Sequence, residues 1–306
     1  MNPAINGKRI PLEIGTTIHF SQTVDNPVAD LPLLQSIGVD SYRDDFTWKN
    51  VETAAGVYSP NATAAKMVTA ASNTSMRPFL VIAYGNDIYG GGFPLTQAAI
   101  DAYCNYAKYV AITYPHVRYL AIWNEPNLTN PTWGGPVTAS QYITLLKAAY
   151  AAIKSVNPNI QVVGGEIAVK DTAWTQDFIN GGGLDYCDVL GLHVYNSNNP
   201  PPTAIDWIRA RQADCIAKLG SAKPMIISEC GYSTWTGGVS ESVQADYLTQ
   251  YIRLCKALPY IKALYWFELR DFGSDASVSE NKWGMRTDAD APKVAWTAFA
   301  AEVALR

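Results

Sequence analysis

The chain has 306 residues, of which 48% are apolar and 16% charged, so it can bury a large core and lies outside the compositions of disordered proteins. Its 23 lysines and arginines nearly balance its 27 aspartates and glutamates, and the formal charge of −4 includes no basic stripe, which argues against nucleic acid as a partner. No apolar stretch approaches the roughly 18 residues of a membrane span, so we expect no such segment.

Short apolar runs alternate with amphipathic or alanine-rich stretches along the whole chain. The runs predict eight strands, at Glu13–Phe20, Ser36–Phe46, Pro78–Tyr84, Arg118–Asn124, Ile160–Gly165, Asp188–Tyr195, Pro224–Glu229 and Lys262–Phe267. The stretches predict eight helices, at Val28–Ile37, Thr63–Ser72, Thr96–Thr113, Ala139–Val156, Trp174–Asn180, Ala204–Leu219, Ser242–Leu258 and Pro292–Leu305. Eight strand–helix repeats in this length are typical of a barrel. We therefore predict an α/β protein with one domain over residues 1–306, a (β/α)₈ TIM barrel.

The segments that follow the predicted strands are longer than those that precede them. The long ones contain aromatic residues, asparagine and proline, and lie at Gly85–Pro94, Pro126–Val137, Asn196–Thr203, Cys230–Ser240 and Arg270–Ala291. Barrels of this kind carry their sites at the carboxyl ends of the strands, so this asymmetry predicts a site there. No glycine-rich phosphate-binding motif follows an early strand, which argues against a nucleotide ligand.

Two of the predicted strands lead directly into a glutamate. The run from Ala121 to Ile122 continues into Trp-Asn-Glu125-Pro, and Met225-Ile-Ile-Ser continues into Glu229. In a barrel both carboxylates would stand at the same rim, three strands apart. Cleavage of a glycosidic bond needs such a pair, because one group protonates the leaving oxygen while the other attacks the anomeric carbon or activates water.

These motifs resemble those of glycoside hydrolase clan A over essentially the whole predicted barrel. Within the clan, the segments 123–128, 266–273 and 280–285 are similar to glycoside hydrolase family 39, including its relatives that degrade bacterial exopolysaccharides. The ending Ser228-Glu-Cys-Gly-Tyr232 differs from that of family 39 xylosidases, so the resemblance does not extend to xylosidase specificity. The resemblance implies a retaining β-glycosidase with Glu125 as general acid/base and Glu229 as nucleophile.

The resemblance also implies roles for residues beside the two glutamates. Asn124 would bond the sugar 2-hydroxyl, and Arg43 would brace Glu229 unless it pairs with a neighbouring aspartate. His193 and Tyr195 lie two apart on a predicted strand and therefore share a face. They would contact the catalytic carboxylates, although His193 could also be a satisfied core histidine.

Aromatic residues near the predicted strand ends are candidates for sugar contact, because aromatic faces pack against the apolar faces of sugars. Trp266 would form the hydrophobic floor under the reacting sugar, and His19 could bond a sugar hydroxyl. Candidate platforms in loops, with plain loop packing as the alternative, are Trp133, Trp235, Tyr84 and Tyr89. Glu166 follows the fifth predicted strand and could bond substrate, but nothing around it resembles a catalytic ending. Glu268, placed within the eighth strand, alternates with Trp266 and could also reach the lumen.

The predicted function is hydrolysis of a polysaccharide or oligosaccharide by double displacement, with cleavage inside the chain because the loops hold more aromatic residues than a one-sugar pocket needs. The alternatives are a non-catalytic carbohydrate-binding barrel, an exo-acting β-glycosidase and a transglycosidase. We expect no cofactor and no metal, because the histidines at 19, 116 and 193 are scattered. We expect a monomer, secreted or periplasmic because polymers do not readily cross membranes.

Overall fold

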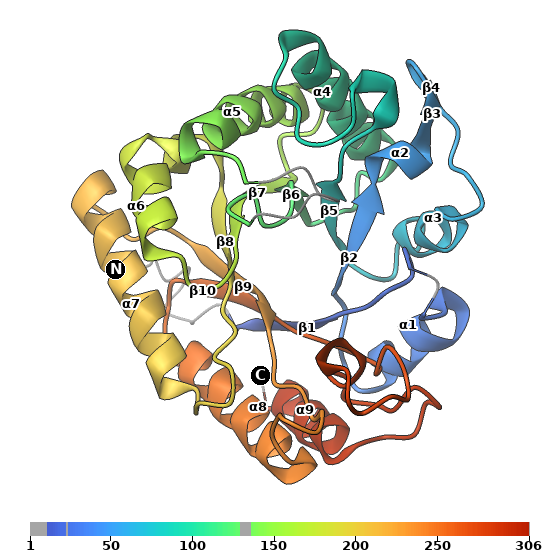
Figure 1. The fold of residues 1–306 in the computed structure, drawn as a ribbon, viewed down its shortest axis with the longest axis vertical. Helices are drawn as coiled ribbons and strands as arrows, with labels where there is room; N and C mark the ends of the chain where they lie inside the picture. The colour runs from blue at the N-terminus through green and yellow to red at the C-terminus, as the bar shows by residue number, and fades with distance from the viewer. Residues whose placement is uncertain (1–10, 23, 129–135, 306) are drawn as a thin grey trace. The chain divides into compact units, whose positions relative to one another are not determined.

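A computed structural model describes residues 11–22, 24–128 and 136–305 (Figure 1). In these ranges eight strands form a closed barrel in the order β1-β10-β9-β8-β7-β6-β5-β2. Their bounds are β1 Glu13–Thr17, β2 Tyr42–Thr47, β5 Phe79–Ala83, β6 Tyr119–Ile122, β7 Gln161–Ile167, β8 Val189–His193, β9 Met225–Cys230 and β10 Ile261–Trp266. Neighbouring strands such as β1 and β10, or β6 and β7, are parallel. The predicted (β/α)₈ barrel is therefore confirmed.

Each predicted helix corresponds to a helix of the structure. These are α1 Pro27–Ser36, α3 Ala65–Ala71, α4 Gln97–Thr113, α5 Ala139–Val156, α6 Thr172–Asn180, α7 Pro202–Leu219, α8 Glu241–Lys256 and α9 Val294–Ala304. Three 3₁₀ turns are also described, η2 Asp87–Tyr89, η3 Gly183–Tyr186 and η4 Ser279–Asn281. Within the described ranges, none of the helices combines the length and apolar character that crossing a bilayer requires.

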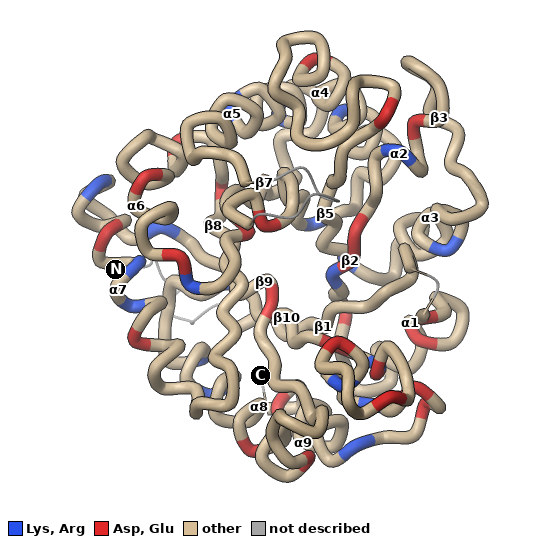
Figure 2. The backbone as a smooth tube through the Cα atoms, viewed as in Figure 1, with Lys and Arg blue, Asp and Glu red and all other residues tan. Residues whose placement is uncertain are grey.

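Contacts group the described residues into two compact units. The first comprises residues 11–18, 28–43 and 193–305, and the second comprises the described residues of 19–27 and 44–192. In the first unit α8 and α9 lie side by side, and in the second α4 and α5 do so (Figure 1). Charges of both signs alternate along α7 (Figure 2), where Arg209 pairs with Asp206 and Arg211 with Asp214.

Burial and capping explain why these segments adopt their structures. All residues of β5, β6 and β8 are buried, as expected for parallel strands covered by helices. Thr138 caps α5 by accepting a hydrogen bond from the backbone N–H of Gln141, whose side chain bonds back to the cap. Ser240 caps α8 by accepting a hydrogen bond from the backbone N–H of Val243.

The structure differs from the prediction at two places. The predicted strand Ser36–Phe46 is wrong at its start, because Ser36 is the last residue of α1 and β2 begins at Tyr42. Gly38, with a φ of +89°, adopts the left-handed conformation that commonly follows a helix end. After β2 the chain forms the short helix α2 (Trp48–Val51) and a hairpin of β3 (Glu52–Ala54) and β4 (Val57–Tyr58), which were not predicted.

Candidate active site

Glu229 lies near the end of β9 and forms an ion pair with Arg43 of β2. Arg43 Nη1 is 2.7 Å from Glu229 Oε1, and the side chains are 3% and 10% exposed. Both residues belong to the first unit, so the contact is made within one compact part of the chain. The guanidinium supplies a counter-charge to a carboxylate that is nearly buried.

His193 and Tyr195 both contact the second carboxylate oxygen of Glu229. The Tyr195 hydroxyl donates a hydrogen bond to Oε2 at 2.6 Å, and His193 Nδ1 lies 3.4 Å from the same atom. Arg43 Nη2 is 3.3 Å from His193 Nε2, and a guanidinium can only donate, so Nε2 must accept. The ring proton is thereby assigned to Nδ1, facing Glu229. Three donors thus surround this carboxylate.

Two aromatic rings adjoin the cradle that Arg43, His193 and Tyr195 form around Glu229, within the first unit. Tyr195 meets the rings of Phe267 and Trp283 edge to face, with centroids 5.9 and 5.1 Å away, and both of those side chains are partly exposed. Trp266, which we predicted to be the floor under the sugar, is instead 0% exposed. Side chains of neighbouring strand residues point in opposite directions, and Phe267, the next residue, is partly exposed where Trp266 is buried.

Glu125 follows β6 in a turn of unusual backbone conformation within the second unit. Trp123 and Glu125 have φ values of 68° and 45°, which non-glycine residues rarely adopt. The turn is held by a hydrogen bond from the Glu125 N–H to the Glu166 carbonyl at 3.1 Å. Asn124 is 5% exposed and Glu125 is partly exposed. Backbone conformations of this kind cost conformational free energy, and they are found mainly at functional sites.

The rival carboxylates Glu166 and Glu268 are 0% and 1% exposed. A Cβ on Gly191 of β8 would stand only 2.0 Å from Glu166 Oε1, so the absence of a side chain at Gly191 makes room for this carboxyl. Glu268 lies beyond the end of β10 rather than within the strand. Glu125 is partly exposed and the Glu229 side chain is 10% exposed, so both are more accessible than these two rivals.

His19 lies beyond β1 in a second polar cluster, which also contains Asp44. The His19 N–H donates to Asp25 Oδ2 at 2.8 Å, and the Ser21 hydroxyl donates to Asp44 Oδ1 at 2.7 Å. Burial raises the pKa of Asp44 to about 7, while the nearby charge of His19 lowers it and that of Asp45 raises it. His19 is 8% exposed, so its proposed contact with a sugar hydroxyl stays a prediction.

The raised pKa of Asp44 predicts a pH-dependent stability. Its folded-state pKa of about 7 exceeds the ordinary value of 3.8, so stability from this group is present at low pH and is lost as the pH rises between these values. The slope is at most about 1.4 kcal/mol per pH unit. Asp44→Asn should remove the pH dependence that this carboxyl gives to the free energy of unfolding. The variant should therefore gain stability relative to the unsubstituted protein from about pH 4 to about pH 7.

Urea unfolding of both proteins across that interval measures this difference. Asp87→Asn, at an exposed position in η2, is the matched control and should follow the unsubstituted protein at every pH. Parallel stability curves for Asp44→Asn and the unsubstituted protein would contradict the prediction.

The candidate loop platforms differ in their surroundings. Tyr89 stacks on Trp48 at 5.2 Å and donates to Glu52 Oε1, which is the loop-packing arrangement. Tyr84 is partly exposed and donates to Asp45 Oδ2 at 2.9 Å. Trp235 is partly exposed after β9, and Trp133 lies outside the described residues.

Phe267 and Trp283 were missed as site residues by the sequence analysis. Phe267 directly follows Trp266, and an alternation argument carried one residue further along the strand would have found it. Trp283 lies in the segment 280–285, which is similar to family 39 but carries no sequence signal that assigns a role to the tryptophan. Its place beside Tyr195 depends on contacts between residues 88 positions apart, which no local pattern contains.

The closed parallel barrel, with a glutamate near the end of β9 and another shortly after β6, is the fold of many barrel enzymes. The family model described as the glycosyl hydrolase catalytic core matches residues 96–295. The chain belongs to this family. A curated β-xylosidase of Geobacillus stearothermophilus is 31% identical over 93 residues, covering 28% of this chain and 17% of that protein.

Solved structures share the fold. A family 39 glycoside hydrolase from the gut symbiont Bacteroides cellulosilyticus has a TM-score of 0.76 at 23% identity, covering 96% of this chain and 64% of that chain. A family 39 β-xylosidase from Caulobacter crescentus has a TM-score of 0.71 at 15% identity, with coverages of 96% and 71%. The chain therefore spans less than two thirds of the length of the β-xylosidase and of the Bacteroides enzyme.

Proposed function

We propose that this protein is a retaining β-glycosidase that acts on a β-linked polysaccharide or oligosaccharide. The observation that carries the proposal is the cradle of Arg43, His193 and Tyr195 around Glu229. A carboxylate held by three donors keeps a fixed orientation, and its side chain, 10% exposed, is not fully enclosed. Membership of the glycosyl hydrolase catalytic core family supports the same reaction class.

In the first half of the proposed reaction, Glu229 attacks the anomeric carbon as the glycosidic bond breaks. Glu125 donates its proton to the leaving oxygen, so the departing sugar leaves as a neutral alcohol. The bond between Glu229 and the sugar forms on the face opposite the leaving group, which inverts the anomeric carbon. Asn124, next to Glu125 and 5% exposed, is assigned to the sugar 2-hydroxyl.

In the second half, water enters from the side that the leaving group vacated. Glu125, now a carboxylate, takes a proton from this water, and the new C–O bond displaces Glu229. The second inversion restores the original configuration. Tyr195 and His193 then donate again to the released carboxylate, while Arg43 balances its returning charge.

The proposed substrate is a polysaccharide that is cut at internal bonds. The proposed place of action is outside the cytoplasm. The loops after β9 and β10, at residues 231–240 and 267–293, supply partly exposed aromatic side chains beyond those that contact Glu229. Additional rings favour the binding of several sugar units over a pocket for one. A polymer of this size does not readily enter a cell, so a secreted or periplasmic enzyme meets it.

The test is digestion of a panel of β-linked glucans, mannans, xylans and mixed exopolysaccharides. We expect a substrate whose first-formed product, followed by NMR, has the anomeric configuration of the bond that was cut. Rapid loss of viscosity with products of mixed length is expected for internal cleavage. Inverted product would contradict the double displacement, and release of monosaccharide alone would contradict internal cleavage.

The same digestion separates the alternatives. A non-catalytic carbohydrate-binding barrel would retain a polysaccharide without releasing reducing ends. A transglycosidase would form products longer than its oligosaccharide substrate, because a sugar acceptor replaces water in the second half-reaction.

A further inference from the structure

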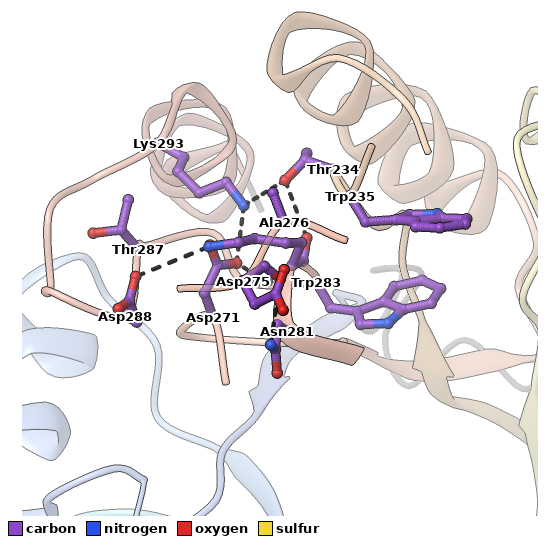
Figure 3. A network of polar contacts seen from close by, with 12 residues as sticks. Thr234, Trp235, Asp271, Asp275, Ala276, Asn281, Trp283, Thr287, Asp288 and Lys293 are labelled. Carbon is purple, nitrogen blue, oxygen red and sulfur yellow. Dashed lines mark hydrogen bonds and ion pairs between the residues drawn. The ribbon is translucent and has the colours of Figure 1, made fainter. Parts of the chain in front are cut away.

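Two tryptophans in the loops after β9 and β10 are partly exposed, Trp235 and Trp283. The two loops are joined by a buried ion cluster built on Lys293 and Asp271. Figure 3 shows this cluster, with both indole rings projecting from it to the same side. The cluster and both rings belong to the first unit, which also contains Glu229. The proposed mechanism uses neither the cluster nor Trp283.

Lys293 is the centre of this cluster. Its ammonium group lies 3.0 Å from Asp271 Oδ1 and donates to Thr234 Oγ1 at 2.9 Å (Figure 3). The Lys293 and Asp271 side chains are 3% and 2% exposed. Burial raises the pKa of Asp271, although Lys293 and Lys282 lower it. One lysine therefore ties the loop after β9 to the loop after β10, at the residue next to Trp235.

The backbone on both sides of Trp283 is fastened to the same cluster. The Lys282 carbonyl accepts from the N–H of Thr234 at 2.8 Å and from its hydroxyl at 3.1 Å. The Gly284 N–H donates to Asp271 Oδ1 at 2.9 Å. A Cβ on Gly284 would come within 2.1 Å of the Asp271 nitrogen, so only glycine permits this approach. Asp271 and Thr234 thus hold Trp283 in position from either side.

The Trp283 ring packs against the residues around the nucleophile. Its centroid is 5.1 Å from that of Tyr195, whose hydroxyl bonds Glu229, and 5.9 Å from that of Phe267. Both contacts are edge to face. The indole N–H is buried without an acceptor among the described residues, so packing alone orients the ring.

We propose that Trp283, with Trp235, binds a sugar unit of the substrate next to the reacting one, and that the Lys293–Asp271 pair positions both rings. The inference rests on the proposed glycosidase function. The Trp283 ring contacts the ring of Tyr195, whose hydroxyl in turn bonds Glu229, so we assign the sugar on the Trp283 face to the position beside the cleaved unit. An indole offers an apolar face that matches the C–H face of a β-linked pyranose.

Binding separates this inference from the glycosidase proposal. The probes are cello-, manno- and xylohexaose, titrated calorimetrically against Glu229→Ala protein so that no hydrolysis occurs. We expect one probe to bind, and addition of Trp283→Ala to weaken its Kd about tenfold, the loss of one well-packed aromatic contact. Trp296→Ala is the matched control, because Trp296 of α9 stacks with Phe299 and Arg286 instead.

Turnover gives the second readout, with Glu229 intact. Trp283→Ala should raise KM for the same hexasaccharide about tenfold with little change in kcat, and should change KM for a nitrophenyl β-glycoside less than about threefold. The nitrophenyl substrate has one sugar and cannot occupy the neighbouring position. Equal effects on both substrates would assign Trp283 to the reacting sugar and overturn the proposal.

The positioning role of Lys293 is tested by Lys293→Met and Lys293→Arg. Lys293→Met should raise the hexasaccharide KM, and Lys293→Arg should raise it less. Combining Lys293→Met with Trp283→Ala should raise KM little beyond the effect of Trp283→Ala alone. Lys293→Met leaves the buried Asp271 with Lys282, at 3.4 Å, in place of two lysine partners, so a lower unfolding temperature is expected in any case. A lower unfolding temperature with an unchanged KM would leave the pair a purely structural role and overturn that part of the proposal.

Hexasaccharide turnover with a Kd that Trp283→Ala leaves unchanged would defeat the Trp283 inference and leave the glycosidase intact. Hexasaccharide binding that depends on Trp283, without turnover of any probe, would defeat the glycosidase proposal instead. Failure of the protein to bind any of the three probes would overturn the Trp283 inference.

Discussion

Glu229→Ala is expected to lower kcat on every glycoside substrate by a factor on the order of 10⁴–10⁶, the scale of loss when a covalent nucleophile is removed. The reason is that no other described carboxylate in the first unit shares the contacts of Glu229 with Arg43, His193 and Tyr195. Initial rates on nitrophenyl and natural substrates measure the loss. Glu241→Ala removes an exposed carboxylate at the start of α8 and should keep full activity.

Azide gives a stereochemical check on the same variant. With Glu229 shortened, azide can attack the anomeric carbon from the face that the carboxylate occupied, and Glu125 can still protonate the leaving group. A β-glycoside should then give an α-glycosyl azide. A β-azide, or activity within tenfold of the unsubstituted enzyme, would show that Glu229 is not the nucleophile.

Glu125→Ala is expected to lower kcat by about 10²–10⁴-fold on a substrate whose leaving group is a sugar, because that oxygen departs only when it is protonated. A dinitrophenyl glycoside has a leaving group that departs as an anion, so formation of the glycosyl-enzyme should be nearly unaffected. Pre-steady-state release of dinitrophenol measures this step. Glu125→Gln is the matched variant, because it keeps the size of the side chain and removes its proton transfer.

Hydrolysis of the glycosyl-enzyme should still be slow in Glu125→Ala, since the base that activates water is gone. Azide needs no base, so it should accelerate turnover and give a β-glycosyl azide, the opposite configuration to that expected for Glu229→Ala. Equal losses on sugar and dinitrophenyl leaving groups would contradict the assignment of Glu125. An α-azide would also contradict it, because it would mean attack from the Glu229 side.

The strands and helices of the barrel were accessible from sequence because their signals are local. An apolar run such as residues 79–83, followed by a capped amphipathic stretch such as residues 97–113, specifies a strand and a helix with little help from distant residues. The start of β2 was misplaced because the apolar run continued through Gly38, and only its left-handed backbone reveals the break. The hairpin at 52–58 has strands too short to produce an alternating pattern.

The surroundings of the candidate residues were only partly accessible. Tyr195 and His193 lie on neighbouring positions of one chain segment, yet whether they contact Glu229 depends on packing across 34 residues or more. Trp266 and Phe267 are adjacent in sequence, and a shift of one residue decides which side chain is buried and which is exposed. Hydrophobicity does not distinguish them, because both are aromatic and follow the same apolar strand.

The sequence by itself determined that Glu125 and Glu229 lie where strands end, because in both segments apolar residues are followed directly by polar ones. The tertiary structure alone decided that Arg43, from a strand more than 180 residues earlier, closes on Glu229 at 2.7 Å. It also decided that Lys293 and Asp271 hold Trp283 beside Tyr195. Such contacts form only when parallel strands in one barrel bring distant residues to the same level, and a one-residue change of register would separate them.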